Sequence, residues 1–207
     1  MPRLWSDTIE AHRRDVRQAV MDTTWQLVVD HGLLAVTMSR IAEEVGVGRA
    51  TLYKYFPDVE TILFARHHEH VLNHLARLAA LRDQAHDPVD ALKAVLTGYA
   101  QICRHRQQHG TDELMRLLHR DAEIAPMHRQ LDDLIAELIV SAAADSTASP
   151  ADVAPGELAN YCRHALEAAS TLTTDEAVDR LVAIVLRGLG CSASPSARKT
   201  LRHHTPG

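Results

Sequence analysis

The chain has 207 residues, of which 46% are apolar, so it is long enough to bury a core and too apolar to be disordered. Its formal net charge of −5 excludes overall basicity as a basis for binding nucleic acid, and no apolar run reaches the roughly 20 residues of a membrane span. No secretory signal is visible and the cysteines are few and widely spaced, so we expect a cytoplasmic protein without a membrane partner.

Helical periodicity recurs along the chain and strand patterns are nearly absent, which predicts an all-α fold. The first predicted helix runs from Asp15 to His31. A second begins after Thr37, a good N-cap residue, and ends at Gly46, where glycine permits the left-handed conformation of a helix end. A third, short helix covers residues 49–56 and is ended by Pro57.

The remaining predicted helices carry apolar stripes at helical spacing. They cover residues 59–84, 88–110, a short segment from Thr111, a segment from Pro126, residues 157–172 and residues 175–189. Residues 144–156 are small, polar and proline-containing, which predicts a loop, and the tail 190–207 is predicted to be disordered. We therefore expect about nine helices, divided between a three-helix domain (1–58) and a C-terminal helical domain (59–189).

The stretch MSRIAEEVGVGRATLYKYF, residues 38–56, joins two helical patterns through Gly-Val-Gly and predicts a helix-turn-helix. Leu52 and Phe56 lie four residues apart, so they are predicted to point inward together. Around the rest of this helix lie Arg49, Ala50, Thr51, Tyr53, Lys54 and Tyr55. Cations can bond guanine and hydroxyls can bond phosphate, so this face fits a DNA groove. An ordinary helical hairpin with a polar outer face is the alternative.

Residues 36–63, VTMSRIAEEVGVGRATLYKYFPDVETIL, resemble the DNA-binding signature of TetR-family transcriptional regulators. The matching positions are Thr37, Ile41-Ala42, Gly46-Val47, Thr51-Leu52-Tyr53, Tyr55-Phe56-Pro57 and Leu63, preceded by HGLLAVT. The resemblance covers about a quarter of the chain. It implies a homodimeric regulator of transcription, most often a repressor, that a small-molecule effector releases from a palindromic double-stranded DNA operator.

The resemblance also implies roles for single residues. Thr37 would contact a phosphate, Arg40 would contact a phosphate or a base, and Tyr53 would hold the DNA backbone. Those that would face the groove are Arg49, Ala50, Thr51, Lys54 and Tyr55.

The sequence departs from the family pattern at two positions. Gly48 stands where a serine-like cap is common, and Val59 stands where a lysine at the start of the next helix is common. The second departure removes a phosphate contact. We hypothesise that arginines of the N-terminal arm and first helix replace it, namely Arg3, Arg13, Arg14 and Arg17.

The last two predicted helices are the candidate dimer interface. The first of them is rich in small residues, which allow close helix approach: Ala159, Ala165, Ala168 and Ala169. Paired across a two-fold axis, the two helices would form a four-helix bundle and fix the spacing of two DNA-reading domains at about 34–36 Å. The alternative is that these helices only complete the core of one chain.

Six residues are candidates for binding an effector: His70, His74, Tyr99, Cys103, Met115 and His119. Each of them has the alternative of being an ordinary core or surface residue. His67, His70 and His74 share one helical face and His105 and His109 are four apart, so a metal-responsive regulator or helical metalloenzyme is the alternative function. The sequence has no phosphate-binding loop, nucleophile elbow or zinc-hydrolase motif, so we expect no enzymatic activity and no cofactor.

Overall fold

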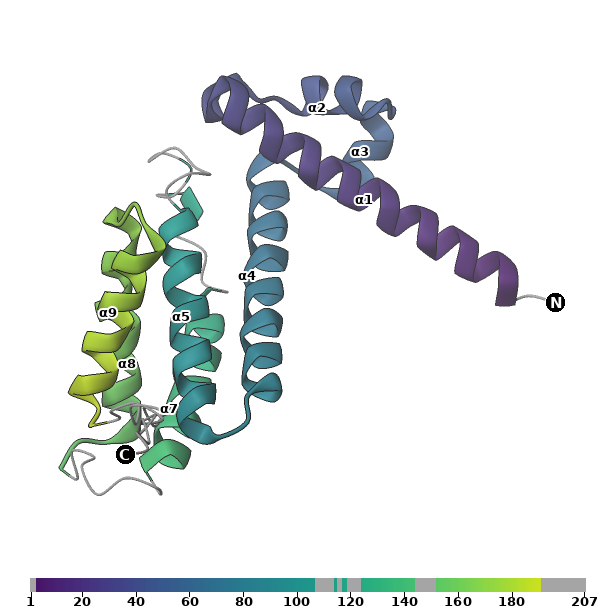
Figure 1. The fold of residues 1–207 in the computed structure, drawn as a ribbon. Helices are drawn as coiled ribbons and strands as arrows, with labels where there is room; N and C mark the ends of the chain where they lie inside the picture. The colour runs from purple at the N-terminus through teal and green to yellow at the C-terminus, as the bar shows by residue number, and fades with distance from the viewer. Residues whose placement is uncertain (1–2, 107–113, 115–116, 119–123, 144–151, 191–207) are drawn as a thin grey trace, which may run out of the picture.

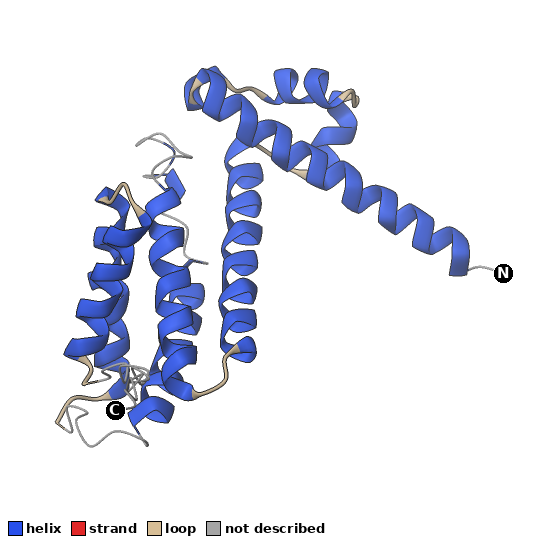
Figure 2. Ribbon diagram, in the orientation of Figure 1, coloured by secondary structure: helices blue, strands red, loops and turns tan. Residues whose placement is uncertain are grey.

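The computed structural model describes residues 3–106, 114, 117–118, 124–143 and 152–190. Within these residues it contains α-helices and short 3₁₀ helices and no strand (Figures 1 and 2). The all-α prediction is therefore confirmed. Two bodies of packed helices follow one another along the chain, a small N-terminal head and a larger C-terminal bundle.

The head consists of four helices and one 3₁₀ turn. They are α1 Arg3–His31, η1 Leu33–Ala35, α2 Met38–Val45, α3 Arg49–Tyr55 and the first turns of α4 Val59–Gln84. The predictions for α2 and α4 match these bounds, and α3 ends one residue before the predicted Phe56. The prediction for α1 was wrong at its start, because the helix begins at Arg3 and not at Asp15. Its apolar stripe only starts at Val16, so periodicity gave no signal for the first turns.

One apolar cluster, here called the head core, holds these helices together. Its buried members are Val20, Met21, Leu27, Val28, Val36, Met38, Ile41, Ala42, Leu52, Phe56, Ile62, Leu63, Leu114 and Leu118. Most come from α1–α3, as predicted. The head core also takes in residues beyond the predicted boundary at residue 58: Ile62 and Leu63 from α4, and Leu114 and Leu118 from the segment that follows α5.

The C-terminal bundle is built from four further helices. They are α5 Pro88–Arg106, α7 Ile124–Ala143, α8 Pro155–Glu167, followed by η2 Ala168–Thr171, and α9 Asp175–Gly188. The α-helix that begins at Pro155 ends at Glu167, and the next four residues form a 3₁₀ helix. The continuous helix predicted to Leu172 was therefore too long. Most of the short helix predicted from Thr111 lies outside the described residues, and so do residues 144–151 of the predicted loop and tail residues 191–207.

Helix α4 connects the head to the bundle (Figure 1). Its 26 residues span roughly 39 Å at the usual rise per residue. Leu63 is buried in the head core, whereas Leu78 is buried in the apolar cluster of the bundle, here called the body core. Gly98 of α5 allows α5 to approach α4 closely, because a Cβ there would lie 2.7 Å from Leu81 Cδ1. The same helix is thus embedded in both cores.

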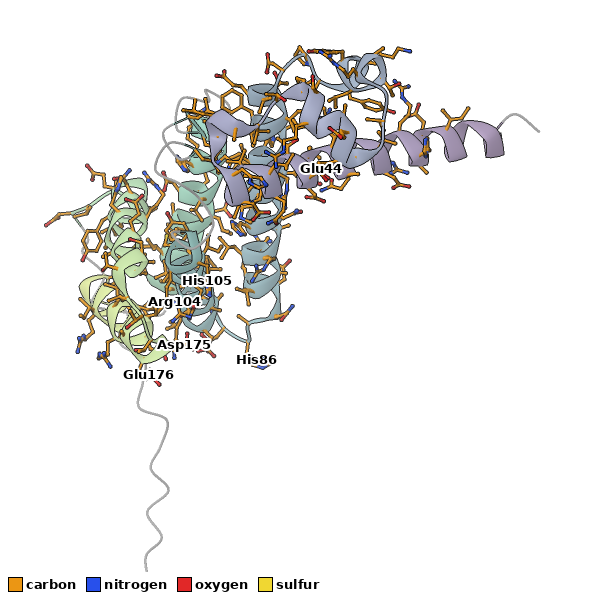
Figure 3. The ribbon with its side chains drawn as sticks, turned by 90° about the horizontal axis from the view of Figure 1, so that it is seen from above. Glu44, His86, Arg104, His105, Asp175 and Glu176 are labelled. Atoms are coloured by element: carbon orange, nitrogen blue, oxygen red, sulfur yellow. The ribbon has the colours of Figure 1, made fainter. Side chains whose placement is uncertain are left out.

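Charged pairs join neighbouring helices. Arg66 Nε of α4 lies 2.9 Å from Asp22 Oδ1 of α1, and Arg163 Nε of α8 donates to Asp132 Oδ1 of α7 at 2.8 Å. At the first turn of α9, Asp175 Oδ1 accepts hydrogen bonds from Gln101 and from Arg104 of α5 (Figure 3). The hydrogen bond from Gln101, then the hydrogen bond and charge of Arg104, lower the pKa of Asp175.

The Asp175 contact makes a testable contribution to stability. Because the pKa of Asp175 is lowered in the fold, its carboxylate stabilises the folded state fully at pH values above the ordinary pKa of aspartate. This stabilisation is lost as the pH falls through the lowered pKa. We expect Asp175→Asn to lower the thermal midpoint at pH 7 and the deficit to shrink under acidic conditions, measured by circular dichroism. Asp179→Asn, an exposed carboxylate on the same helix, is the matched control. Equal losses in both variants at both pH values would contradict the assignment.

Candidate nucleic-acid interface

The turn between α2 and α3 has the geometry that its residues predict. Thr37 is the N-cap of α2, and its side-chain oxygen accepts a hydrogen bond from the backbone N–H of Arg40 at 3.3 Å. Gly46 ends α2 with φ 75° and ψ 29°, a left-handed conformation that glycine adopts without steric cost. The N–H of Val47 then bonds to the carbonyl of Ala42 at 3.0 Å. The chain is thereby turned sharply from α2 into α3.

The inner side of α3 anchors it to the head. Leu52 is fully buried and Phe56, which directly follows the helix, is 1% exposed. They pack in the head core together with Ile41 and Ala42 of α2, as the spacing predicts. The back of α3 is therefore apolar and completely covered, which leaves its other side to solvent.

The outer side of α3 and the start of α2 form one polar surface, here called the recognition surface. It comprises Thr37, Arg40, Arg49, Ala50, Thr51, Tyr53, Lys54 and Tyr55. All of them are exposed except Arg40 and Tyr55, which are half-buried. Tyr55 packs partly against the head core, so its ring also supports the helix. Their contacts with DNA remain predictions.

The cations of the recognition surface are not neutralised by the protein. Arg49 and Lys54 form no ion pair within the part of the chain that the structure describes. Arg66 and Arg163, in contrast, lie against carboxylates. Exposed cations beside hydroxyls, on a helix whose back is fixed, can bond phosphate oxygens and guanine edges.

One contact of the head was not visible in the sequence. The guanidinium carbon of Arg17, on α1, lies 4.4 Å from the centre of the Phe56 ring. The two residues are far apart in the chain, so neither spacing nor a motif pointed to this contact.

Four of the six predicted effector residues lie in the described part of the chain. Tyr99 and Cys103 are buried in the body core, 5% and 2% exposed. His74 is half-buried and His70 exposed, with ring centroids 4.1 Å apart. Met115 and His119 lie outside the described residues. Their role in binding an effector stays a prediction.

The metal alternative finds no support in the described residues, where no three His, Cys, Asp or Glu side chains are grouped so that they could hold a metal ion. His109, one of the histidines considered, lies outside that part of the chain. Within the same residues, no helix has the length and apolarity to cross a membrane.

Two of the four alanines predicted to allow close approach across a dimer interface lie instead in the core of the single chain. Ala159 and Ala169 are fully buried in the body core of the single chain. They therefore allow α8 and η2 to pack against their own neighbours. Of the four alanines, Ala165 is half-buried and Ala168 is exposed.

Comparison with known proteins matches the region where the head geometry is found. The family described as bacterial regulatory proteins, tetR family, matches residues 20–65. The HTH-type transcriptional regulator BetI of Rhizobium meliloti is 40% identical over 81 residues, which are 39% of this chain and 35% of that protein. An HTH-type transcriptional regulator of Staphylococcus aureus is 26% identical over 80 residues, 39% of this chain and 43% of that protein. These matches thus span less than half the length of either relative.

Solved structures extend the likeness to the whole fold. A transcriptional regulator of the TetR/AcrR family from Thermobifida fusca aligns with a TM-score of 0.70 and 20% identity, over 84% of this chain and 98% of that one. The fatty acid degradation regulator FadR from Bacillus halodurans aligns with a TM-score of 0.61 and 17% identity, over 84% and 94%. Residues 20–65 therefore match the tetR family of bacterial regulatory proteins in sequence, and the all-helical fold is shared with these solved structures from head to bundle.

Proposed function

We propose that this protein is a homodimeric transcriptional repressor that binds a palindromic operator and is released by a small-molecule effector. The observation that carries the DNA-binding part is the recognition surface, where Arg49 and Lys54 have no ion pair with any described residue and lie on a helix anchored by the buried Leu52 and Phe56. Chromosomal DNA as the partner also agrees with the expected cytoplasmic location.

The dimensions of α3 fit a DNA groove. An α-helix with its side chains is about 10–12 Å across, which fits a major groove about 12 Å wide, and the seven residues of α3 give roughly 10 Å of helix to lie in it. Arg49 and Thr51, in the first turn of α3, are then placed to meet base edges and the groove wall. Lys54 and Tyr53 lie on the later turn, closer to phosphates. Thr37 sits at the start of α2, where its exposed hydroxyl can meet the DNA backbone.

Arg49→Ala tests the recognition surface. Loss of a bidentate contact to guanine costs about 1–3 kcal/mol, so we expect affinity for the operator to fall roughly 5- to 150-fold. Fluorescence anisotropy with a duplex from the region upstream of the protein's own gene measures this. Arg129→Ala, an exposed arginine of α7, is the matched control and should bind as the parent protein does. Unchanged affinity in Arg49→Ala and Lys54→Ala alike would contradict the proposed surface.

Dimerisation is supported by the outward faces of α8 and α9. Tyr161 is 49% exposed and Ile184 is 53% exposed, large apolar groups left uncovered by the single chain. A Cβ at Gly188 would lie 3.5 Å from the Tyr161 hydroxyl, so the two helices share one outer surface at this point. Ala183 adds a small exposed residue beside Ile184. Two copies pairing these faces form a four-helix bundle and hold both heads at a fixed spacing.

Ile184→Glu tests this interface against a matched control. Val140 of α7 is 54% exposed, so Val140→Glu places the same charge on an equally exposed apolar residue of a different helix. We expect Ile184→Glu to yield monomers in light-scattering chromatography and to weaken operator binding, and Val140→Glu to remain dimeric. A dimer that survives Ile184→Glu, or dissociates equally in both variants, would exclude this face.

Release by an effector requires that the bundle and the head be mechanically connected. Leu114 and Leu118, which follow α5, are fully buried in the head core, and α4 is embedded in both cores. A ligand that prefers one arrangement of these segments shifts the heads toward one spacing and lowers operator affinity by its differential binding to the two states. His74, on the half-buried side of α4, and Tyr99, on α5, remain the first residues to change once such a ligand is found.

A further inference from the structure

The start of α4 is unsuited to holding a phosphate. Asp58 is the N-cap, and its carboxylate accepts a hydrogen bond from the backbone N–H of Thr61 at 2.7 Å. Glu60 adds a second, exposed carboxylate in the first turn. Val59, between them, is half-buried and packs against the head core. Two negative charges in the first turn of α4 repel the DNA backbone, so a phosphate contact beyond those proposed for Lys54 and Tyr53 must come from an element other than α4.

Helix α1 brings arginines to the same region. Arg13 lies four residues before Arg17 and Arg14 lies three residues before it. This helical spacing places all three on one side of α1. All are exposed. We call them the α1 arginine face. Arg17 lies one turn before the buried Val20, so this end of the α1 arginine face borders the head core.

Contact with the head fixes one of these arginines. The guanidinium of Arg17 lies over the Phe56 ring, 4.4 Å from its centre. Such stacking suits arginine, whose charged group is planar and weakly hydrated, and it leaves the N–H donors at the edge of the group available for an acceptor. A guanidinium held in this way loses little rotational freedom when it binds a phosphate.

The α1 arginine face is also available for a new partner. Within the described residues, Arg14 and Arg17 form no ion pair. Arg13 lies 3.6 Å from Glu10, but both side chains are more than 60% exposed, so this pair is weak and exchangeable. Phe56 directly follows α3, so Arg17 lies beside the C-terminal end of the helix whose outer side carries the recognition surface.

We propose that the α1 arginine face is a phosphate-binding surface for duplex DNA, in which stacking on the Phe56 ring holds the Arg17 guanidinium in position. The inference rests on the proposed DNA-binding function and adds to it a contact that carries no sequence information. It explains how a head with an acidic first turn of α4 can still hold the DNA backbone beside the end of α3.

Salt dependence of binding tests the proposal. Each phosphate contact that is lost lowers the slope of log affinity against log salt concentration by roughly 0.9. We expect Arg14→Ala and Arg17→Ala each to lower this slope, and to weaken binding to the operator and to a scrambled duplex by the same factor. Arg17→Lys keeps the charge and should keep most of the slope. Arg77 is an exposed arginine in the C-terminal half of α4, and Arg77→Ala should leave the slope unchanged.

The outcomes separate this proposal from the proposed function. Suppose that the parent protein binds duplexes with a clear salt slope and that both Arg14→Ala and Arg17→Ala keep that slope. The phosphate-binding role of the α1 arginine face is then wrong, and the DNA-binding function stands. If the parent protein binds no duplex even at low salt, both fall. Thermal unfolding accompanies the titrations, because Arg17 covers Phe56. Arg14 is exposed on α1, and the guanidinium stacked on that ring is that of Arg17, so the Arg14 variant reports on DNA binding without disturbing the core.

Discussion

Burial of Leu52 and Phe56 is the constraint on which the head depends. Isolated helices shorter than about 12 residues are marginal in water, so the seven residues of α3 are helical because their inner side is packed. Full burial of each such side chain is worth about 1.5–3 kcal/mol. With the back held in this way, the outer side is free to carry groups that add nothing to folding. The Phe56 ring has a second use, because its other face supports the guanidinium of Arg17.

The same constraint connects the head to the rest of the chain. The cluster that buries Phe56 also buries Leu63 of α4, together with Leu114 and Leu118 from the segment after α5. Packed cores change between discrete arrangements and do not deform smoothly. A rearrangement of α4 or of that segment therefore changes the packing that holds α3 in place. Leu78, at the far end of α4, is part of the body core, so one helix carries the connection in both directions.

Local chemistry explains why the helix-turn-helix could be predicted from the sequence. Thr37 as a cap and Gly46 as a left-handed helix end depend only on their immediate neighbours, and both are confirmed. Long-range contacts could not be predicted in this way. The stacking of Arg17 on Phe56 joins distant parts of the chain, and the alanines of α8 gave no sign of whether they face their own chain or a partner. The effector residues were the least predictable, because Tyr99 and Cys103 have helical spacing that core and ligand-lining residues share.

A protein with a net charge of −5 can still bind DNA if its few cations are well placed. Residues 1–66 hold eight Lys and Arg against nine Asp and Glu, so even the head is not basic as a whole. At physiological salt, charges more than about 8 Å from the DNA are largely screened, and the carboxylates of the bundle then weigh little. What remains is the local field of α3 and of the α1 arginine face, where Arg49, Lys54, Arg14 and Arg17 have no carboxylate partner among the described residues. In the proposed complex so few cations lie at the contact that each would carry a large share of the electrostatic attraction, and the surrounding negative charge would limit attachment in any other orientation.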